Sequence, residues 1–199
     1  MSATSPLKLI LASASPRRTE LLSAAGIPHE VVVAKVTEHE DTATDPKEMV
    51  LHNAQLKARA VAKQFPNAVI LGADTTVALA EHALNKPANL NESREMLRRL
   101  SGKTHTVHTG ICLICQDLGI EELHDITAWV KFRVLTEDAI TQYQARVNTL
   151  DKAGAYGIQE GSEIIIDDYQ RPISTIMGLP VEFVVERLNA LGLRARISA

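Results

Sequence analysis

The segment Ser-Ala-Ser-Pro-Arg-Arg, residues 13–18, combines residue types that could bind an anion. Ser15 suits the N-cap of a helix and Pro16 suits its first turn, so a helix is expected to begin here. Arg17 and Arg18 then fall at the positive end of the helix dipole, which disfavours cations. A phosphate chain bound among the helix N–H groups, the serine hydroxyls and the two guanidinium groups would remove that conflict. The alternative is a pair of exposed arginines on a surface helix.

Two carboxylates follow predicted strands and could act as a base or as metal ligands. Asp74 comes after the apolar run 68–71 and after Gly72, a residue that permits close backbone approach. Glu38 follows the β-branched run 31–36 in the same way. Such carboxylates can accept a proton from water, or hold a divalent cation that bridges phosphate oxygens. The alternatives are an aspartate in a turn and a solvated charge at a strand end.

Three further polar residues could contact a ligand. Lys57 lies on the apolar stripe of a predicted helix, four residues before Val61, so it must extend to solvent, pair with a carboxylate or face a cleft. Lys86 lies in a loop, where a lysine is usually solvated. Residues 152–159 read Lys-Ala-Gly-Ala-Tyr-Gly-Ile-Gln. Lys152, Tyr156 and Gln159 could bind a ligand, and the small residues between them would let it come close. The amide of Gln159 could form two hydrogen bonds with a base edge.

The paired histidines and cysteines do not indicate a metal or redox centre. His105 and His108, and likewise Cys112 and Cys115, are three residues apart on one predicted strand, so the members of each pair face opposite sides. We expect core cysteines in a reducing, intracellular compartment, and structural or surface histidines. No Walker-type glycine loop is present, and no Ser-His-Asp or Cys-His arrangement is evident.

The elements that must position these residues mix helices with strands. Strands are predicted at 9–12, 31–36, 68–71 with an extension over 75–79, 104–115, 121–134 and 163–167, and helices at 16–25, 46–65, 91–100, 136–147 and 178–191. Residues 117–119, Asp-Leu-Gly, predict a hairpin turn. Because helical crossovers and hairpins both occur, a mixed α/β sheet is predicted.

Composition describes an ordinary globular protein. The chain has 199 residues, 45% of them apolar and 23% charged, which fits one domain or one domain with two lobes. The net charge of −3 argues against a nucleic-acid partner, so anion binding would come from a local cluster. No apolar run reaches the roughly 18 residues of a membrane helix. We therefore expect no membrane association and a cytoplasmic location.

Together these motifs resemble those of the Maf family of nucleoside-triphosphate pyrophosphatases. The resemblance runs from about residue 8 to residue 191 and rests on several segments in the same order. These are LILASASPRR at 9–18, Glu38, AQLKA at 54–58, GADT at 72–75, KP at 86–87, LSG at 100–102, KAGAYGIQ at 152–159 and GLP at 178–180. The chain departs from the family pattern at Asn85, where glycine is usual, and over residues 167–177. The departures concern the rim of the expected cleft and the order of substrates.

The resemblance implies a fold, a reaction and an assembly. The implied fold is a single domain over residues 1–199, an elongated mixed sheet flanked by helices, with two lobes around a cleft, similar to inosine-triphosphate pyrophosphatases. The implied reaction is hydrolysis of a nucleoside triphosphate between its α- and β-phosphates, with a divalent cation such as Mg²⁺ or Mn²⁺. The products are the nucleoside monophosphate and pyrophosphate. The implied assembly is a homodimer.

The resemblance also assigns roles to positions that match the family motifs. Asp74 is implied to be the proton acceptor, and Glu38 and Asp74 the metal ligands. The implied triphosphate-binding residues are Ser13, Arg17, Arg18, Lys57 and Lys86. Arg17, Thr75 and Gln159 are implied to contact substrate and to set specificity, and they resemble the branch that acts on dTTP and UTP.

Two alternatives stay open. The first is a pyrophosphatase for 7-methyl-GTP or for non-standard purine nucleotides, which would differ only in the base pocket. The second is a protein without enzymatic activity that inhibits septum formation in cell division by binding a protein or nucleic acid. A panel of substrates distinguishes the first, and a catalytically inactive variant distinguishes the second.

Overall fold

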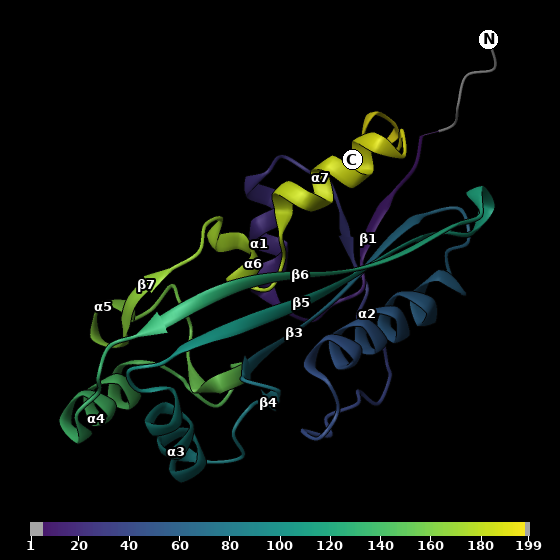
Figure 1. The fold of residues 1–199 in the computed structure, drawn as a ribbon. Helices are drawn as coiled ribbons and strands as arrows, with labels where there is room; N and C mark the ends of the chain where they lie inside the picture. The colour runs from purple at the N-terminus through teal and green to yellow at the C-terminus, as the bar shows by residue number, and fades with distance from the viewer. Residues whose placement is uncertain (1–5, 198–199) are drawn as a thin grey trace.

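The structure, a computed structural model, describes residues 6–197 (Figure 1). The ends of the predicted 1–199 domain, residues 1–5 and 198–199, lie outside the described residues. The strands are β1 (Leu9–Leu11), β2 (Glu30–Val31), β3 (Val69–Leu79), β4 (His82–Leu84), β5 (Thr104–Cys115), β6 (Ile120–Phe132) and β7 (Ile166–Tyr169). The helices are α1 (Pro16–Ala24), α2 (Pro46–Ala62), α3 (Leu90–Leu100), α4 (Glu137–Arg146), α5 (Ser162–Ile165), α6 (Ile173–Ile176) and α7 (Val181–Ala190).

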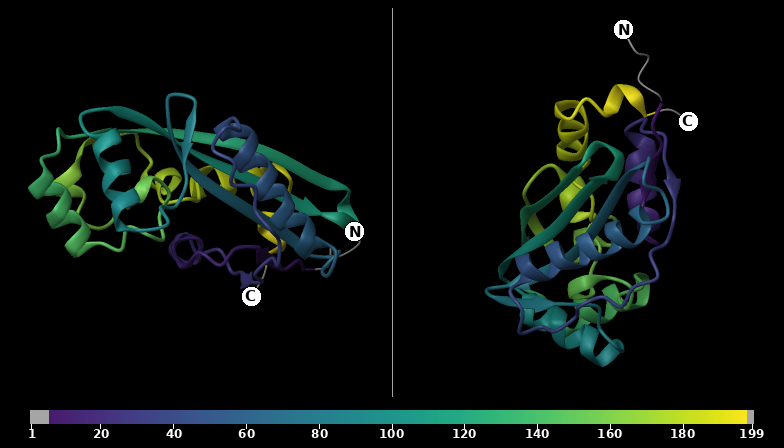
Figure 2. Two further views of the ribbon diagram at one scale, coloured as in Figure 1. Left: turned by 90° about the horizontal axis from the view of Figure 1, so that it is seen from below. Right: turned by 90° about the vertical axis from the view of Figure 1, so that its right-hand side faces the viewer.

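The strands form one seven-stranded mixed sheet. The order is β2-β1-β3-β5-β6-β7, and β4 pairs with β3. β1 is parallel to β2 and β3, while the other pairs are antiparallel. The long strands β3, β5 and β6 give the molecule its elongated shape (Figure 2). The predicted mixed α/β sheet flanked by helices is confirmed.

Separate apolar clusters fix the helices on different parts of the sheet, with α3, α4 and α5 together at one end of the long strands (Figure 1). One cluster joins α1 and α7 to β1 and includes Leu22 and Leu188. A second cluster joins α3, α4 and α5 to β5 and β6 and includes Leu97 and Phe132. A third cluster holds α2 on the sheet through Ala54 and other small side chains.

Two glycines bring α2 unusually close to the sheet. A Cβ atom added to Gly72 on β3 would lie 2.3 Å from the carbonyl oxygen of Ala54, and one added to Gly110 on β5 would lie 2.3 Å from that of Val50. Only a residue without a side chain fits under the helix backbone at these points. The predicted close approach at Gly72 is therefore present, and the same face of α2 carries Lys57.

The strand predicted at 31–36 is wrong beyond Val31. β2 covers only Glu30–Val31, because its partner β1 ends at Leu11, opposite Val31. A β-branched run cannot continue a ladder without a neighbouring strand. The residues that follow, including Glu38, are instead held by side chains of other segments.

The strand predicted at 163–167 is also displaced. Residues Ser162–Ile165 form α5 and the strand begins at Ile166. A short run of isoleucines carries no periodicity that separates helix from strand, and Gly161, with φ of 63°, starts the helical turn. β4 and α6 were not predicted.

The predicted core position of the two cysteines agrees with the structure. Cys112 and Cys115 are buried and free, and they belong to different apolar clusters on opposite faces of the sheet. Burial raises the pKa of Cys112 to about 12, so its thiol is unreactive. Within residues 6–197, no helix is both long and apolar enough to cross a membrane.

The close contact of α2 with the sheet makes a stability prediction. We expect Gly110→Ala to lower the free energy of unfolding by about 3 kcal/mol, the upper end for overpacking, because backbone atoms rather than flexible side chains obstruct the added methyl group. Chemical denaturation measures this loss. Gly119→Ala is the control, because its Cβ meets no atom within 4 Å and only the φ of 65° opposes it, at a cost of about 1–2 kcal/mol. Equal losses in the two variants would contradict the close-contact explanation.

Candidate active site

A cavity of about 650 Å³ opens along the free edge of β3. β1 pairs with β3 only as far as Leu71, and β4 begins to pair at Val77, so neither strand covers the edge between these positions. Asp74 and Thr75 lie in this gap. The cavity wall includes every site residue predicted from the sequence. These are Ser13, Arg17, Arg18, Glu38, Lys57, Asp74, Thr75, Lys86 and Gln159.

Lys57 lies between two carboxylates. Its Nζ is 2.7 Å from Oε2 of Glu38 and 2.8 Å from Oδ1 of Asp74. The side chains of Lys57 and Asp74 are only 10% and 13% exposed, whereas that of Glu38 is 40% exposed. Of the open alternatives for Lys57, the structure selects both a carboxylate partner and a position facing the cleft.

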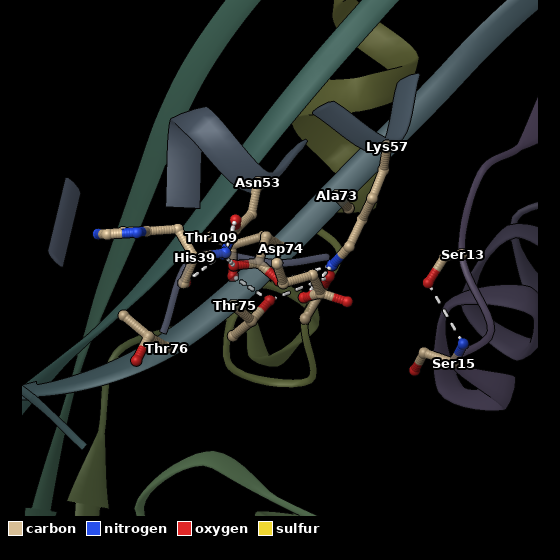
Figure 3. A network of polar contacts seen from close by, with 12 residues as sticks. Ser13, Ser15, His39, Asn53, Lys57, Ala73, Asp74, Thr75, Thr76 and Thr109 are labelled. Carbon is tan, nitrogen blue, oxygen red and sulfur yellow. Dashed lines mark hydrogen bonds and ion pairs between the residues drawn. The ribbon is translucent and has the colours of Figure 1, made fainter. Parts of the chain in front are cut away.

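Asn53 was missed in the sequence and completes this cluster. Its Nδ2 donates to Oδ2 of Asp74 at 3.1 Å, so both carboxylate oxygens of Asp74 are bound from α2 (Figure 3). Asn53 is 2% exposed and lies four residues before Lys57 on the same helix face. The sequence signal that could have identified Asn53 is its position one helical turn before Lys57, on the same apolar stripe of the helix.

Arg18 binds mainly to the protein. Its Nη1 donates to Oγ of Ser13 at 2.8 Å and to the carbonyl of Ala73 at 2.9 Å, Nη2 donates to Oγ1 of Thr75 at 3.1 Å, and Nε donates to the carbonyl of Gly178 at 2.8 Å. Burial lowers the pKa of Arg18, while the charges of Asp74 and Glu38 raise it. Arg18 thus joins α1, β3 and the turn before α7, and most of its donors are already used.

Arg17 differs from its neighbour. Its Nη1 lies 3.8 Å from Oδ2 of Asp151, and its side chain is 33% exposed at the cavity wall. Ser15 occupies the predicted N-cap of α1, but its hydroxyl forms no capping hydrogen bond. Instead, the hydroxyl of Ser13 accepts from the backbone N–H of Ser15 at 3.2 Å (Figure 3). Of the two adjacent arginines, Arg18 therefore binds protein groups, whereas Arg17 is partly exposed at the cavity wall.

The loop 152–159 forms another part of the cavity wall. Of its three candidate ligand-binding side chains, Lys152 and Tyr156 bond to other protein groups, whereas Gln159 does not within residues 6–197. Lys152 donates to Asp151 and to the carbonyl of Asn148, both at 2.8 Å, and the hydroxyl of Tyr156 bonds Nε2 of His105 at 2.8 Å. In the described part of the chain, the side chains of Gln159 and Lys86 form no hydrogen bond or ion pair. Gln159 and Lys86 thus keep their polar atoms available in the cavity.

Asn85, a departure from the family pattern, anchors the rim. Its Nδ2 donates to the carbonyl of Glu40 at 2.9 Å, and its Oδ1 accepts from the hydroxyl of Thr76 at 3.1 Å. The side chain thereby ties the segment after Glu38 to β3. A glycine at this position could not make these contacts.

The carboxylates fit a divalent cation only together with substrate oxygens. No group of three or more His, Cys, Asp or Glu side chains within residues 6–197 could hold a metal ion alone. Glu38 and Asp74 are two carboxylates brought together on one ammonium group. Mg²⁺ typically binds to one or two carboxylates plus substrate phosphates, so the donor set suits that mode.

The fold and the cavity define an α/β protein whose charged cleft combines a helix N-terminus, cations and paired carboxylates. The chain belongs to the Maf family, since the family model described as Maf-like protein matches residues 8–191. The family resemblance stated from the sequence motifs is confirmed.

Curated relatives extend this similarity over nearly the full chain. The dTTP/UTP pyrophosphatase of Akkermansia muciniphila is 44% identical over 187 residues, covering 94% of this chain and 98% of the relative. The dTTP/UTP pyrophosphatase of Deinococcus radiodurans is 44% identical, covering 98% of each chain. That of Bacillus anthracis is 42% identical, covering 92% of this chain and 94% of the relative. A solved structure of a nucleoside-triphosphatase / dITP/XTP pyrophosphatase from Mycobacterium abscessus covers 94% of this chain and 97% of its own, with 15% identity and a TM-score of 0.44. Similarity of that size supports no functional conclusion.

His105, which is hydrogen-bonded to Tyr156 in the cavity wall, should make the stability of the folded protein depend on pH. Burial lowers the pKa of His105 to about 4, so the folded protein keeps this ring neutral, whereas the unfolded chain protonates it below about pH 6.5. Stability should therefore fall as the pH drops from 6.5 toward 4, by up to about 1.4 kcal/mol per pH unit. We expect His105→Gln, which can still bond Tyr156, to show a smaller loss in urea denaturation across this window. Parallel curves for the two proteins would rule out this role of His105.

Proposed function

We propose that this protein hydrolyses dTTP and UTP between the α- and β-phosphates, releasing the monophosphate and pyrophosphate. The observation that carries the proposal is the Glu38–Lys57–Asp74 cluster, which faces Arg17 and Lys86 across one cavity. The printed names of the relatives, at 42–44% identity, support the choice of substrate.

Asp74 accepts the proton of the attacking water in this proposal. A carboxylate has about four lone-pair sites, so Asp74 can bind a water while Lys57 and Asn53 hold its two oxygens in a fixed orientation. Ser13, Arg17, Lys57 and Lys86 bind the triphosphate together with the N-terminus of α1. Arg18 supports them by holding Ser13 and Thr75, with one remaining N–H free for an oxygen.

Glu38 and Asp74 would hold a divalent cation, Mg²⁺ or Mn²⁺, jointly with phosphate oxygens. When bound, this ion supplies neutralisation of the charge on those oxygens. The protein residues position water and phosphates, which is the main catalytic contribution expected for reactions of this kind.

Base selection falls to Arg17, Thr75 and Gln159 in the proposal. Gln159 offers both a donor and an acceptor, and its side chain is free of other partners among the described residues. The hydroxyl of Thr75 accepts from Nη2 of Arg18 and is hydrogen-bonded to the hydroxyl of Thr109, so Thr75 sets the shape of the pocket beside Gly178. We also propose a homodimer, from the family resemblance, and a cytoplasmic location, from the two free cysteines.

Asp74→Asn tests the reaction. We expect pyrophosphate release from dTTP and UTP to fall by at least about 10²–10⁴-fold, because the amide cannot accept the proton of water. The assay measures pyrophosphate from a panel of nucleoside triphosphates with Mg²⁺ or Mn²⁺, and circular dichroism checks the fold. Near-normal turnover by Asp74→Asn would refute the assignment. Wild-type activity confined to 7-methyl-GTP or inosine nucleotides would refute the choice of substrate, and no hydrolysis of any nucleotide would favour a binding protein.

Gln159→Glu separates base recognition from phosphate binding. We expect this variant to change the ratio of kcat/KM between pyrimidine and purine nucleotides, because a carboxylate accepts hydrogen bonds but donates none. Lys86→Ala is the comparison, and it should weaken phosphate contact with every nucleotide alike. A uniform loss across bases in Gln159→Glu would exclude its proposed role.

A further inference from the structure

The segment that carries Glu38 has no strand beside it, so something else must fix its place. Sheet pairing ends at Val31, and the next helix begins at Pro46. Among the described residues, three side chains from other elements form hydrogen bonds or ion pairs with residues 38–40 of this segment. They are Lys57 on the Glu38 carboxylate, Asn53 on the His39 backbone and Asn85 on the Glu40 carbonyl.

Asn53 makes the most extensive of these contacts. Its Oδ1 accepts from the backbone N–H of His39 at 2.8 Å, and its Nδ2 donates to the His39 carbonyl at 2.9 Å. The same Nδ2 donates to Oδ2 of Asp74 at 3.1 Å. The backbone N–H requires an acceptor, so it fixes the orientation of the amide and leaves Nδ2 to face Asp74. Figure 3 shows the side chain between His39 and Asp74.

We propose that Asn53 is a positioning residue that sets the separation of Glu38 and Asp74. One buried amide holds the backbone next to Glu38 and one oxygen of Asp74, while Lys57, one helical turn away, binds the carboxylates themselves. Both side chains project from α2, whose distance from the sheet is fixed by Gly72 and Gly110. The geometry of the two carboxylates therefore depends on a single rigid helix.

The residue type at position 53 follows from this task. A leucine would leave a partly buried N–H and a carbonyl of His39 without partners. An aspartate would keep an acceptor for the N–H, but it would lose both donations and place a second negative charge beside Asp74. An asparagine supplies the acceptor and the two donors in the space available.

This inference rests on the proposed function, and its test compares Asn53→Leu with Ser93→Ala. Ser93 is also a fully buried polar residue on a helix, with a hydrogen bond from its hydroxyl to Thr149 at 2.7 Å, and it lies outside the cavity wall. We expect Asn53→Leu to lower kcat for dTTP by about 10–100-fold with KM changed much less, because the phosphate-binding cations stay in place. We expect Mn²⁺ affinity, measured by titration calorimetry in the presence of a non-hydrolysable dTTP analogue, to weaken by about tenfold. Ser93→Ala should change neither quantity.

The outcomes separate the two proposals. A wild-type protein that hydrolyses no nucleotide defeats the proposed function, whereas an active wild type with unchanged kcat and Mn²⁺ affinity in Asn53→Leu defeats only the positioning role. Equal effects in Asn53→Leu and Ser93→Ala, or a loss confined to KM, also overturn that role. If Asn53→Leu does not fold, Asn53→Asp replaces it, because it keeps the shape and the acceptor for His39. The same loss of kcat is then expected, because both donations to His39 and Asp74 are gone, and a normal kcat overturns the proposal.

Discussion

The packing of α2 directly onto β3 and β5 is the constraint on which the candidate site depends. Gly72 and Gly110 allow the helix backbone to reach the strands, and nothing larger fits at either point. This contact brings two side chains from one helix face, Asn53 and Lys57, onto both oxygens of Asp74. The third apolar cluster, built largely from alanines, stabilises the same contact. Small residues in the core thus determine where charged residues meet.

Burying charges is costly unless they are paired, and the cleft solves this problem in two ways. Lys57 balances Asp74 and the more exposed Glu38, so a nearly buried ammonium group and carboxylate compensate each other. Arg18 is satisfied by neutral oxygens instead, from Ser13, Thr75 and two carbonyls. Arg17, the next residue, remains at the cavity wall. Successive helix positions point in different directions, so one arginine supports the architecture while the other stays accessible.

The errors in the secondary-structure prediction have identifiable physical causes. The run after Val31 has strand-forming residues, but the short β1 offers no partner beyond Leu11. The isoleucines at 164–166 fit helix or strand equally, and the turn at Gly161 decides between them. Asn53 was missed because an asparagine among apolar positions has no distinctive spacing until its partners His39 and Asp74 are known. For the run after Val31 and for Asn53, the deciding neighbour is distant in sequence.

The sequence alone determined the periodic elements, the mixed sheet, the family and the set of nine candidate residues, because hydrophobic periodicity and motif order are local properties of the chain. The Pro16 and Gly72 signals also marked a helix start and a close contact without reference to the rest of the fold. Tertiary structure decided what those residues do to one another. It paired Lys57 with two carboxylates, directed most donors of Arg18 into the protein, and left Gln159 and Lys86 free among the described residues. Such outcomes depend on distances between segments tens of residues apart, and only the packed helix and sheet define those distances.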